Sequence, residues 1–246
     1  MPCPYLERVT EPSDESTGKA ILPLFPLQTV LLPGTHLPLH IFEPRYRQLM
    51  TDLVGDVVPD REFGVIALRT AMIREVSGPE HVHEVGCTTV LREAKRLPDG
   101  RFDVVTTARR RFRLLGIDRV SAPYLIGSVE WMPDDRVASV HGDTVARLAD
   151  VAKAAHRRYC ESAWHADDWT TPPDDGDINA LAYRLTADCL LPLEDRQRLL
   201  EESNPLRRLR IACRLLTREA GFLNTLGAVP MPPGELGEFT RPSNLN

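Results

Sequence analysis

The segment LHIFEPRY holds the first side chains whose types suggest that they bind another molecule. Phe42 and Tyr46 lie on either side of Arg45, where a helix is expected to begin. Aromatic and arginine side chains are enriched at the energetic centres of protein interfaces. We therefore expect Phe42, Arg45 and Tyr46 to border a peptide-binding groove, with His40 and Leu39 as lesser candidates.

The same segment has a purely structural interpretation. Glu43-Pro44 places a proline at the favoured first position of a helix. Glu43 can then accept hydrogen bonds from the first free backbone N–H groups of that helix. In this alternative Phe42 and Tyr46 are ordinary core residues, and both interpretations stay open at the level of sequence.

A second group consists of arginines that alternate along an expected strand. Arg109, Arg111 and Arg113 alternate with other side chains, and a strand would place all three guanidinium groups on one face. Such a face suits an acidic partner or a nucleic acid. The formal net charge of −5 favours the alternative of a solvated strand face.

Other polar residues do not complete a site for a metal or a cofactor. His81 and His83 share a strand face, and His156 lies four residues before Cys160, but neither pair has a third ligand at a suitable spacing. The acid-rich stretch around Asp174 lacks the spacing of a calcium loop. We expect no metal, no cofactor and no catalytic residues, since no G-x-S-x-G motif occurs either.

Short strands fill the first half of the chain. Pro33-Gly34 and Pro98-Asp99-Gly100 are turn signals, and the second one joins the arms of a hairpin. The prolines near residue 23 and residue 38 predict strands at an edge or at a corner, because proline cannot donate a ladder hydrogen bond. A helix is predicted from Pro44 until Gly55. Further strands are predicted at 63–68, 85–91, 112–117 and 124–131.

Helical spacing replaces the strand pattern after Pro133. We predict a helix capped by Asp143, a second capped by Asp177, a short helix over 194–202, and a last helix that Asn204 caps and Gly221 ends. The fold class is therefore α+β, with a β part followed by a helical part. The predicted parts are a disordered leader at 1–19, a β-barrel at 20–133, a helical bundle at 140–222 and a disordered tail at 227–246.

Composition places the protein among ordinary globular chains. The start has no apolar core like that of a signal peptide, and no apolar run is long enough to span a membrane. The five cysteines contain no C-x-x-C pair. We expect a cytoplasmic protein with no membrane partner, because free thiols are typical of a reducing compartment.

The segment LPLFPLQTVLLPGTHLPLHIFEPRYRQLM resembles the opening of the Lon protease N-terminal, substrate-binding domain family. Three further blocks agree with this resemblance, which extends over about residues 21–220 and is closest to the free-standing bacterial members. They are FGVIAL, VGCTTVLREAKRLPDGRFDVVTTARRRFRLLG and LPLEDRQRLLEESNPLRRLRIACRLL. The resemblance implies a PUA-like β pseudo-barrel followed by a helical bundle.

The resemblance also implies a non-catalytic module that binds unfolded or tagged polypeptide segments, in a protease or chaperone system. The sequence contains no G-x-x-x-x-G-K-[ST] phosphate loop, so we expect neither ATPase nor protease activity. Two alternatives remain open. One is RNA binding by a PUA-like fold, which the negative charge makes the less favoured choice, and the other is a small-molecule enzyme that uses a cleft between barrel and bundle.

Overall fold

The computed structural model describes residues 18–73, 75–136, 142–164 and 176–226, with Trp169 and Pro172. The chain divides into two compact units, one of residues 1–133 with 196–203, the other of 134–195 with 204–246. Residues Arg196–Ser203 cluster with the first unit, although they fall within the range 140–222 that was predicted to be the helical part. The expected tail and all but the last two residues of the expected leader lie outside the described residues.

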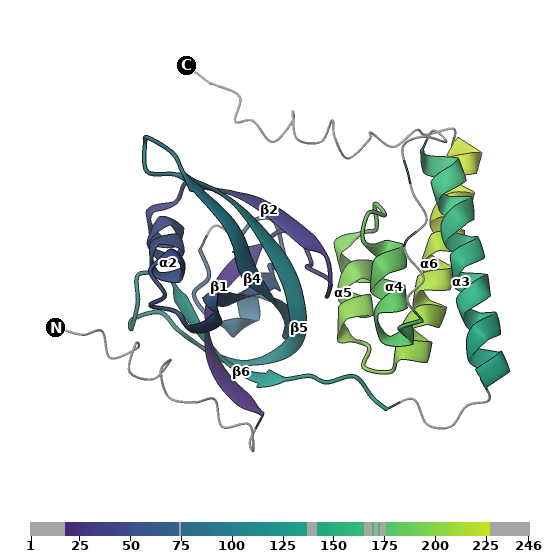
Figure 1. Ribbon diagram of the computed structural model, residues 1–246, viewed down its shortest axis with the longest axis horizontal. Helices are drawn as coiled ribbons and strands as arrows, with labels where there is room; N and C mark the ends of the chain where they lie inside the picture. The colour runs from purple at the N-terminus through teal and green to yellow at the C-terminus, as the bar shows by residue number, and fades with distance from the viewer. Residues whose placement is uncertain are drawn as a thin grey trace. The chain divides into compact units, whose positions relative to one another are not determined.

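The first unit is built on one six-stranded sheet that closes on itself (Figure 1). The order is β2-β5-β4-β3-β1-β6, and β5 also pairs with β6, which joins the two sides. The predicted α+β class is confirmed. The strands are β1 (Lys19–Leu27), β2 (His36–Ile41), β3 (Glu62–Ala67), β4 (Val85–Arg96), β5 (Phe102–Asp118) and β6 (Leu125–Trp131).

Glycines make room for a large aromatic side chain inside this closed sheet. Phe112 is fully buried, in a cluster with residues such as Leu24 and Val129. A Cβ atom on Gly64 would lie 2.9 Å from the Phe112 ring, and one on Gly86 would lie 2.4 Å from it. Both distances are shorter than a carbon–carbon contact, so two neighbouring strands need glycine where the ring packs.

The two predicted turns form at glycines with left-handed backbone. Gly34 and Gly100 both have φ of +82°, a conformation that side chains with a Cβ rarely adopt. The Gly100 N–H donates to Leu97 O at 2.9 Å and closes the β4–β5 hairpin. The turn chemistry in the sequence is therefore confirmed at both places, although β4 and β5 are longer than predicted.

Helix α2 (Pro44–Val54) begins at the predicted proline, but its first turn is not capped as expected. The Glu43 side chain makes no capping hydrogen bond; it bonds to Arg45, with Nε 3.0 Å from Oε2. Burial is confined to one face, which carries Tyr46, Leu49, Met50 and Leu53. The helix ends at Gly55, as predicted.

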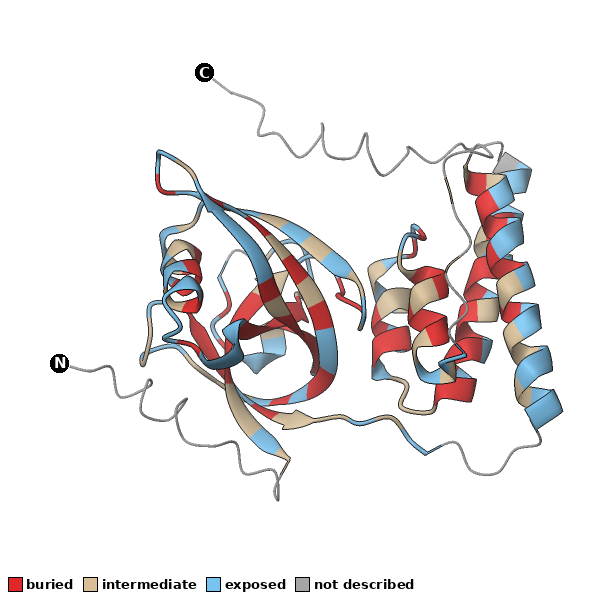
Figure 2. Cartoon of the chain, in the orientation of Figure 1, coloured by how far each residue is buried: buried red, intermediate tan, exposed pale blue. Residues whose placement is uncertain are grey.

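The second unit contains helices that pack by their apolar faces (Figure 2). They are α3 (Gly142–Ala163), α4 (Ile178–Thr186) and α6 (Pro205–Leu226), while the residues of α5 (Leu193–Glu201) are divided between the two units after Asp195. The Asp177 carboxylate accepts from Asn179 N–H, and the Asn204 side chain accepts from two N–H groups of α6, so both predicted caps are confirmed.

Two predicted helix ends are wrong. Helix α3 already includes Gly142, so Asp143 lies in its first turn and is not the N-cap. Helix α6 continues through Gly221 to Leu226. Gly221 is exposed and keeps helical backbone, because an interior glycine costs a helix only about 1 kcal/mol and the packed residues around it offset that cost.

A buried arginine organises the second unit. The Arg208 side chain is fully buried and pairs with Asp134, and it donates to Asn179 O at 2.9 Å. Its guanidinium carbon lies 4.2 Å from the centre of the Tyr183 ring. The charge of Arg208 is thus balanced by a carboxylate and a carbonyl, as a buried cation requires.

Among the helices of the described ranges, none is long and apolar enough to cross a membrane.

Candidate functional site

Strand β2 offers the backbone edge that the prolines predicted. It pairs with β5 on one side, and it is the end member of the strand order. Ala108 N–H donates to Thr35 O, and this pattern repeats every second residue in an antiparallel ladder. The backbone groups of Leu37, Leu39 and Ile41 therefore face β5, and those of His36, Pro38 and His40 face away from it.

Pro38 thus occupies an outward-facing position, where it removes one N–H from the free edge but disrupts no ladder bond. The outward carbonyls of β2 and the N–H of His40 remain able to bond an added strand. A proline here makes pairing with another long strand less favourable while it leaves room for a short extended segment.

Phe42 follows β2 directly and is exposed for 62% of its surface. Its ring stacks on His40, with the ring centroids 6.5 Å apart. His40 Nδ1 lies 2.7 Å from Asp103 Oδ1, and Arg101 Nη1 lies 3.2 Å from His40 Nε2. A neutral imidazole with its proton on Nδ1 satisfies both bonds. Phe42 is therefore presented to solvent beside an imidazole ring that two neighbours hold in place.

Tyr46 does not line this surface, which corrects the expectation that it forms an exposed platform with Phe42. Its side chain is only 4% exposed, and its ring stacks on Phe25 at a centroid distance of 4.1 Å. Burial raises the pKa of the Tyr46 phenol to about 12. Tyr46 is buried because helical spacing places it on the inward face of α2, together with Leu49 and Leu53.

Arg45 packs against the buried aromatic residue Tyr46 and pairs with Glu43. Its guanidinium carbon lies 4.7 Å from the centre of the Tyr46 ring, and its Nη2 lies 2.8 Å from Glu43 Oε2. The Arg45 side chain keeps 30% of its surface exposed. Of the predicted residues, His40 and Phe42 stack on each other at the surface, Leu39 and Arg45 are half-buried, and Tyr46 is buried.

The predicted arginine face on β5 is not formed. Arg109 and Arg113 are exposed, but Arg111 is buried and donates to the carbonyl oxygens of Leu200, Glu202 and Pro133. A β-bulge separates Arg109 from the other two, and a covering segment buries Arg111 but not Arg113. Thr89 pairs with Ala108 but Cys87 pairs with Arg111, so β5 has one extra residue at this point. The extra residue places Arg109 on the opposite face from Arg111 and Arg113, which pair regularly with Cys87 and Val85 and share one face.

Sequence reasoning missed the residues that hold this surface. Asp103 and Arg101 bind His40 from a strand more than sixty positions away in the chain, and no local signal marks that pairing. The role of Pro38 was visible as an edge-strand signal, but its outward register was not.

A histidine and a cysteine meet inside α3, but their arrangement does not activate the thiol. Cys160 Sγ lies 3.4 Å from His156 Nε2. Burial, with the nearby carboxylate of Asp188, raises the pKa of the Cys160 thiol to about 11. Burial also lowers the pKa of His156. A catalytic cysteine needs the opposite shift, towards the thiolate.

We expect iodoacetamide at pH 7.5 to alkylate Cys160 about a hundredfold more slowly in the folded protein than in urea. A thiol pKa about two units above its usual value leaves about a hundredth of the thiolate. Mass spectrometry of the peptide that contains Cys160 measures the rate. Native-state alkylation as fast as in urea would contradict this assignment and would reopen a catalytic interpretation.

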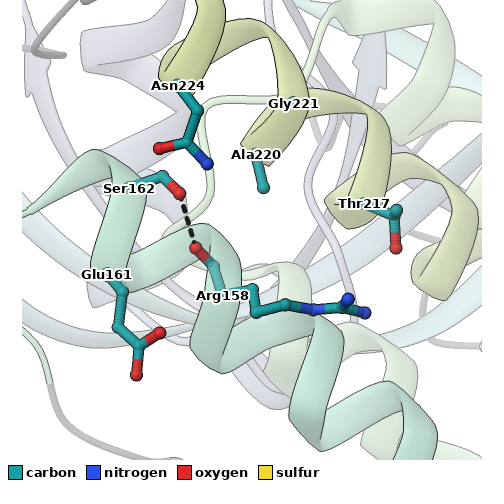
Figure 3. A pocket seen from close by; sticks show the side chains of 7 residues that line it. All are labelled: Arg158, Glu161, Ser162, Thr217, Ala220, Gly221 and Asn224. Carbon is teal, nitrogen blue, oxygen red and sulfur yellow. Dashed lines mark hydrogen bonds between the residues drawn. The ribbon is translucent and has the colours of Figure 1, made fainter.

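A pocket of about 370 Å³ opens between α3 and α6 (Figure 3). It is lined from α3 by Arg158, Glu161 and Ser162, and from α6 by Thr217, Ala220, Gly221 and Asn224. The Ser162 hydroxyl donates to Arg158 O at 2.8 Å, so it is engaged with its own helix. Within the described ranges, no group of three or more His, Cys, Asp or Glu side chains is placed to hold a metal ion.

Comparison of the sequence with known proteins shows which family the chain resembles. The sequence profile of the ATP-dependent protease La (LON) substrate-binding domain matches residues 21–218. The chain is 27% identical over 220 residues to Lon protease 1 of Herpetosiphon aurantiacus, which covers 89% of this chain and 26% of that protein. It is 32% identical over 114 residues to Lon protease 1 of Thermus thermophilus, or 46% of this chain and 14% of that one. The chain therefore spans about a quarter or less of these relatives.

Solved structures show the same fold. A Lon N-terminal domain protein from Xanthomonas campestris superposes with a TM-score of 0.54 at 24% identity, over 86% of this chain and 99% of the other. The N-terminal domain of a Mycobacterium avium complex Lon protease gives a TM-score of 0.55 at 17% identity, over 80% and 98%.

Proposed function

This chain belongs to the family of Lon substrate-binding domains, and from that premise we propose that it binds exposed or unfolded polypeptide segments without cleaving them. The proposed partners are substrate proteins, including tagged ones, and the protease system that degrades them. The matched region corresponds to a substrate-binding domain, and the sequence has no phosphate loop for ATP hydrolysis.

The observation that carries this proposal is the exposed Phe42 ring at the end of a free strand edge. An extended peptide that adds to such an edge gains backbone hydrogen bonds, and side-chain contacts supply selectivity. Unfolded chains differ from folded ones in the apolar side chains that they expose. Phe42 offers such side chains an apolar contact, while Arg45 and His40 offer polar contacts at its border.

Substitution Phe42→Ser should weaken the capture of an unfolded chain about tenfold or more, the loss of about 1.4 kcal/mol that one apolar anchor supplies. The free energy of unfolding should change by less than about 0.5 kcal/mol, because the ring is mostly exposed. Fluorescence anisotropy with a labelled, reduced and alkylated protein that cannot refold measures the dissociation constant.

Met72→Ser is the matched control for that measurement. Met72 is 88% exposed in the same unit and is also a large apolar side chain. Its loss should leave capture unchanged if Phe42 is the specific contact. Equal weakening by both substitutions would show that any exposed apolar residue serves, and absence of capture by the unaltered protein would refute the proposed function.

A further inference from the structure

Helix α6 carries a row of exposed arginines on the side that faces away from the buried core. Arg207, Arg210, Arg214 and Arg218 follow one another at intervals of three, four and four residues, and all four are exposed. At 3.6 residues per turn these intervals keep the side chains on one stripe, about 16 Å long. The apolar face of the same helix includes Leu209, Leu216 and Ala220, which are buried.

Most of this positive charge is not neutralised by the protein itself. Arg218 pairs with Asp195 and Glu219, at 2.6 and 2.5 Å. The other three guanidinium groups form no hydrogen bond or ion pair with any residue in the described ranges. Arg208, between them in sequence, points inward to its buried partners. Exposed cations in one line, without acids between them, attract an extended acidic partner.

Two features beside the row give it the composition of a protein interface. Phe222 is 54% exposed and lies one turn beyond Arg218. The pocket between α3 and α6 is next to the row, because Thr217 and Gly221, which line it, are within a turn of Arg214 and Arg218 in the helix. Arginine and aromatic side chains next to a pocket are typical of binding hot spots.

We propose that the α6 row, formed by Arg207, Arg210, Arg214 and Arg218 with Phe222 at its end, docks an acidic polypeptide segment. A helical segment with glutamates or aspartates at three- and four-residue intervals matches the spacing of the guanidinium groups, and Arg can bind each carboxylate through two N–H groups. An apolar side chain of the partner packs against Phe222. This surface is separate from Phe42, and the inference does not depend on the proposed polypeptide capture.

Charge favours a protein partner over a nucleic acid. The affinity of a protein for nucleic acid grows with the number of phosphates that its cations neutralise. The row supplies four guanidinium groups, one of them already paired, on a chain with a net charge of −5. A short carboxylate-bearing helix needs only one arginine per turn, which is what the row provides.

The test uses the full chain and a fluorescein-labelled helical peptide with glutamates at three- and four-residue spacing and one leucine. We expect binding that weakens as salt is added, because the contacts are exposed ion pairs. The charge reversal Arg207→Glu, Arg210→Glu and Arg214→Glu should raise the dissociation constant tenfold or more. The corresponding Arg→Gln triple variant should give an intermediate loss, and it serves as the test if the charge reversal does not fold.

The control variant changes the net charge by the same amount, at three other exposed arginines that have no partner within the described ranges. It combines Arg109→Glu, Arg113→Glu and Arg157→Glu. This variant should bind the peptide within about twofold of the unaltered protein. If both charge reversals weakened peptide binding equally, the effect would depend only on the net charge of the protein, and the proposal would be overturned. Absence of peptide binding at low salt would also overturn it, as would tighter binding of a single-stranded RNA that depends on the same three arginines.

Discussion

Substitution Arg111→Met should lower the free energy of unfolding of the first unit by about 3 kcal/mol or more. The Arg111 guanidinium donates to Leu200 O at 2.9 Å and to Glu202 O at 3.2 Å, at the end of α5. Methionine fills most of the volume but leaves these buried carbonyls without donors, and each hydrogen bond to a charged group is worth about 1.5–3 kcal/mol. Urea denaturation monitored by tryptophan fluorescence measures the loss.

The neighbouring strand position supplies the control. Arg113 lies two residues further along β5 and is exposed, so Arg113→Met should change the free energy of unfolding by less than about 0.5 kcal/mol. Hydrogen exchange should also become faster in residues 196–203 of the Arg111 variant, because these residues lose their contact with β5. Equal costs for both substitutions, or unchanged exchange in that segment, would contradict the role of Arg111.

Arg111 also shows why the candidate site could be read only in part from the sequence. The alternation of Arg109, Arg111 and Arg113 was visible, but the bulge that turns Arg109 away from the other two depends on the pairing of β5 with β4. A shift of one residue exchanges the two faces of a strand, so a pattern argument fails wherever an extra residue is inserted. Two of the three carbonyls that bind Arg111, those of Leu200 and Glu202, lie about ninety residues away in the chain.

Signals that act within a few residues were more reliable. The Asp177 and Asn204 caps and the glycines at positions 34 and 100 were predicted correctly, because each depends only on local backbone geometry. Gly221 failed as a helix end, because the packing of α6 decides where that helix stops. The helical spacing of the arginines on α6 was present in the sequence, but only the structure shows that Arg208, in the same segment, is buried.

The segment LHIFEPRY left two interpretations open, and the structure places its two aromatic residues in different environments. Phe42 follows a strand and is exposed, whereas Tyr46 lies on the inward face of the helix that begins two residues later. Strand and helix periods meet at Glu43, so neither period alone could assign both rings. This division makes the two aromatic residues separable by experiment.

Tyr46→Ala should lower the free energy of unfolding by about 3–5 kcal/mol, as truncations of buried aromatic side chains do. The loss removes the stack on Phe25 and leaves Arg45 without the ring below it. Thermal and urea denaturation measure the change, and Phe42→Ala should cost less than about 1 kcal/mol in the same assay. A cost for Tyr46→Ala no larger than that for Phe42→Ala would contradict the assignment of Tyr46 to the core.

Tyr46→Phe keeps the ring and removes only the hydroxyl group, which isolates the effect of ionisation on stability. Burial raises the pKa of the Tyr46 phenol from 10.0 to about 12, so the folded state favours the neutral form. The resulting stability is fully present below pH 10 and is lost as the pH rises through 12. A shift of two units corresponds to roughly 2.7 kcal/mol. Between pH 10 and 12 the unaltered protein should therefore lose up to about that much more stability than Tyr46→Phe. Parallel losses in the two proteins would show that the Tyr46 hydroxyl remains in contact with water.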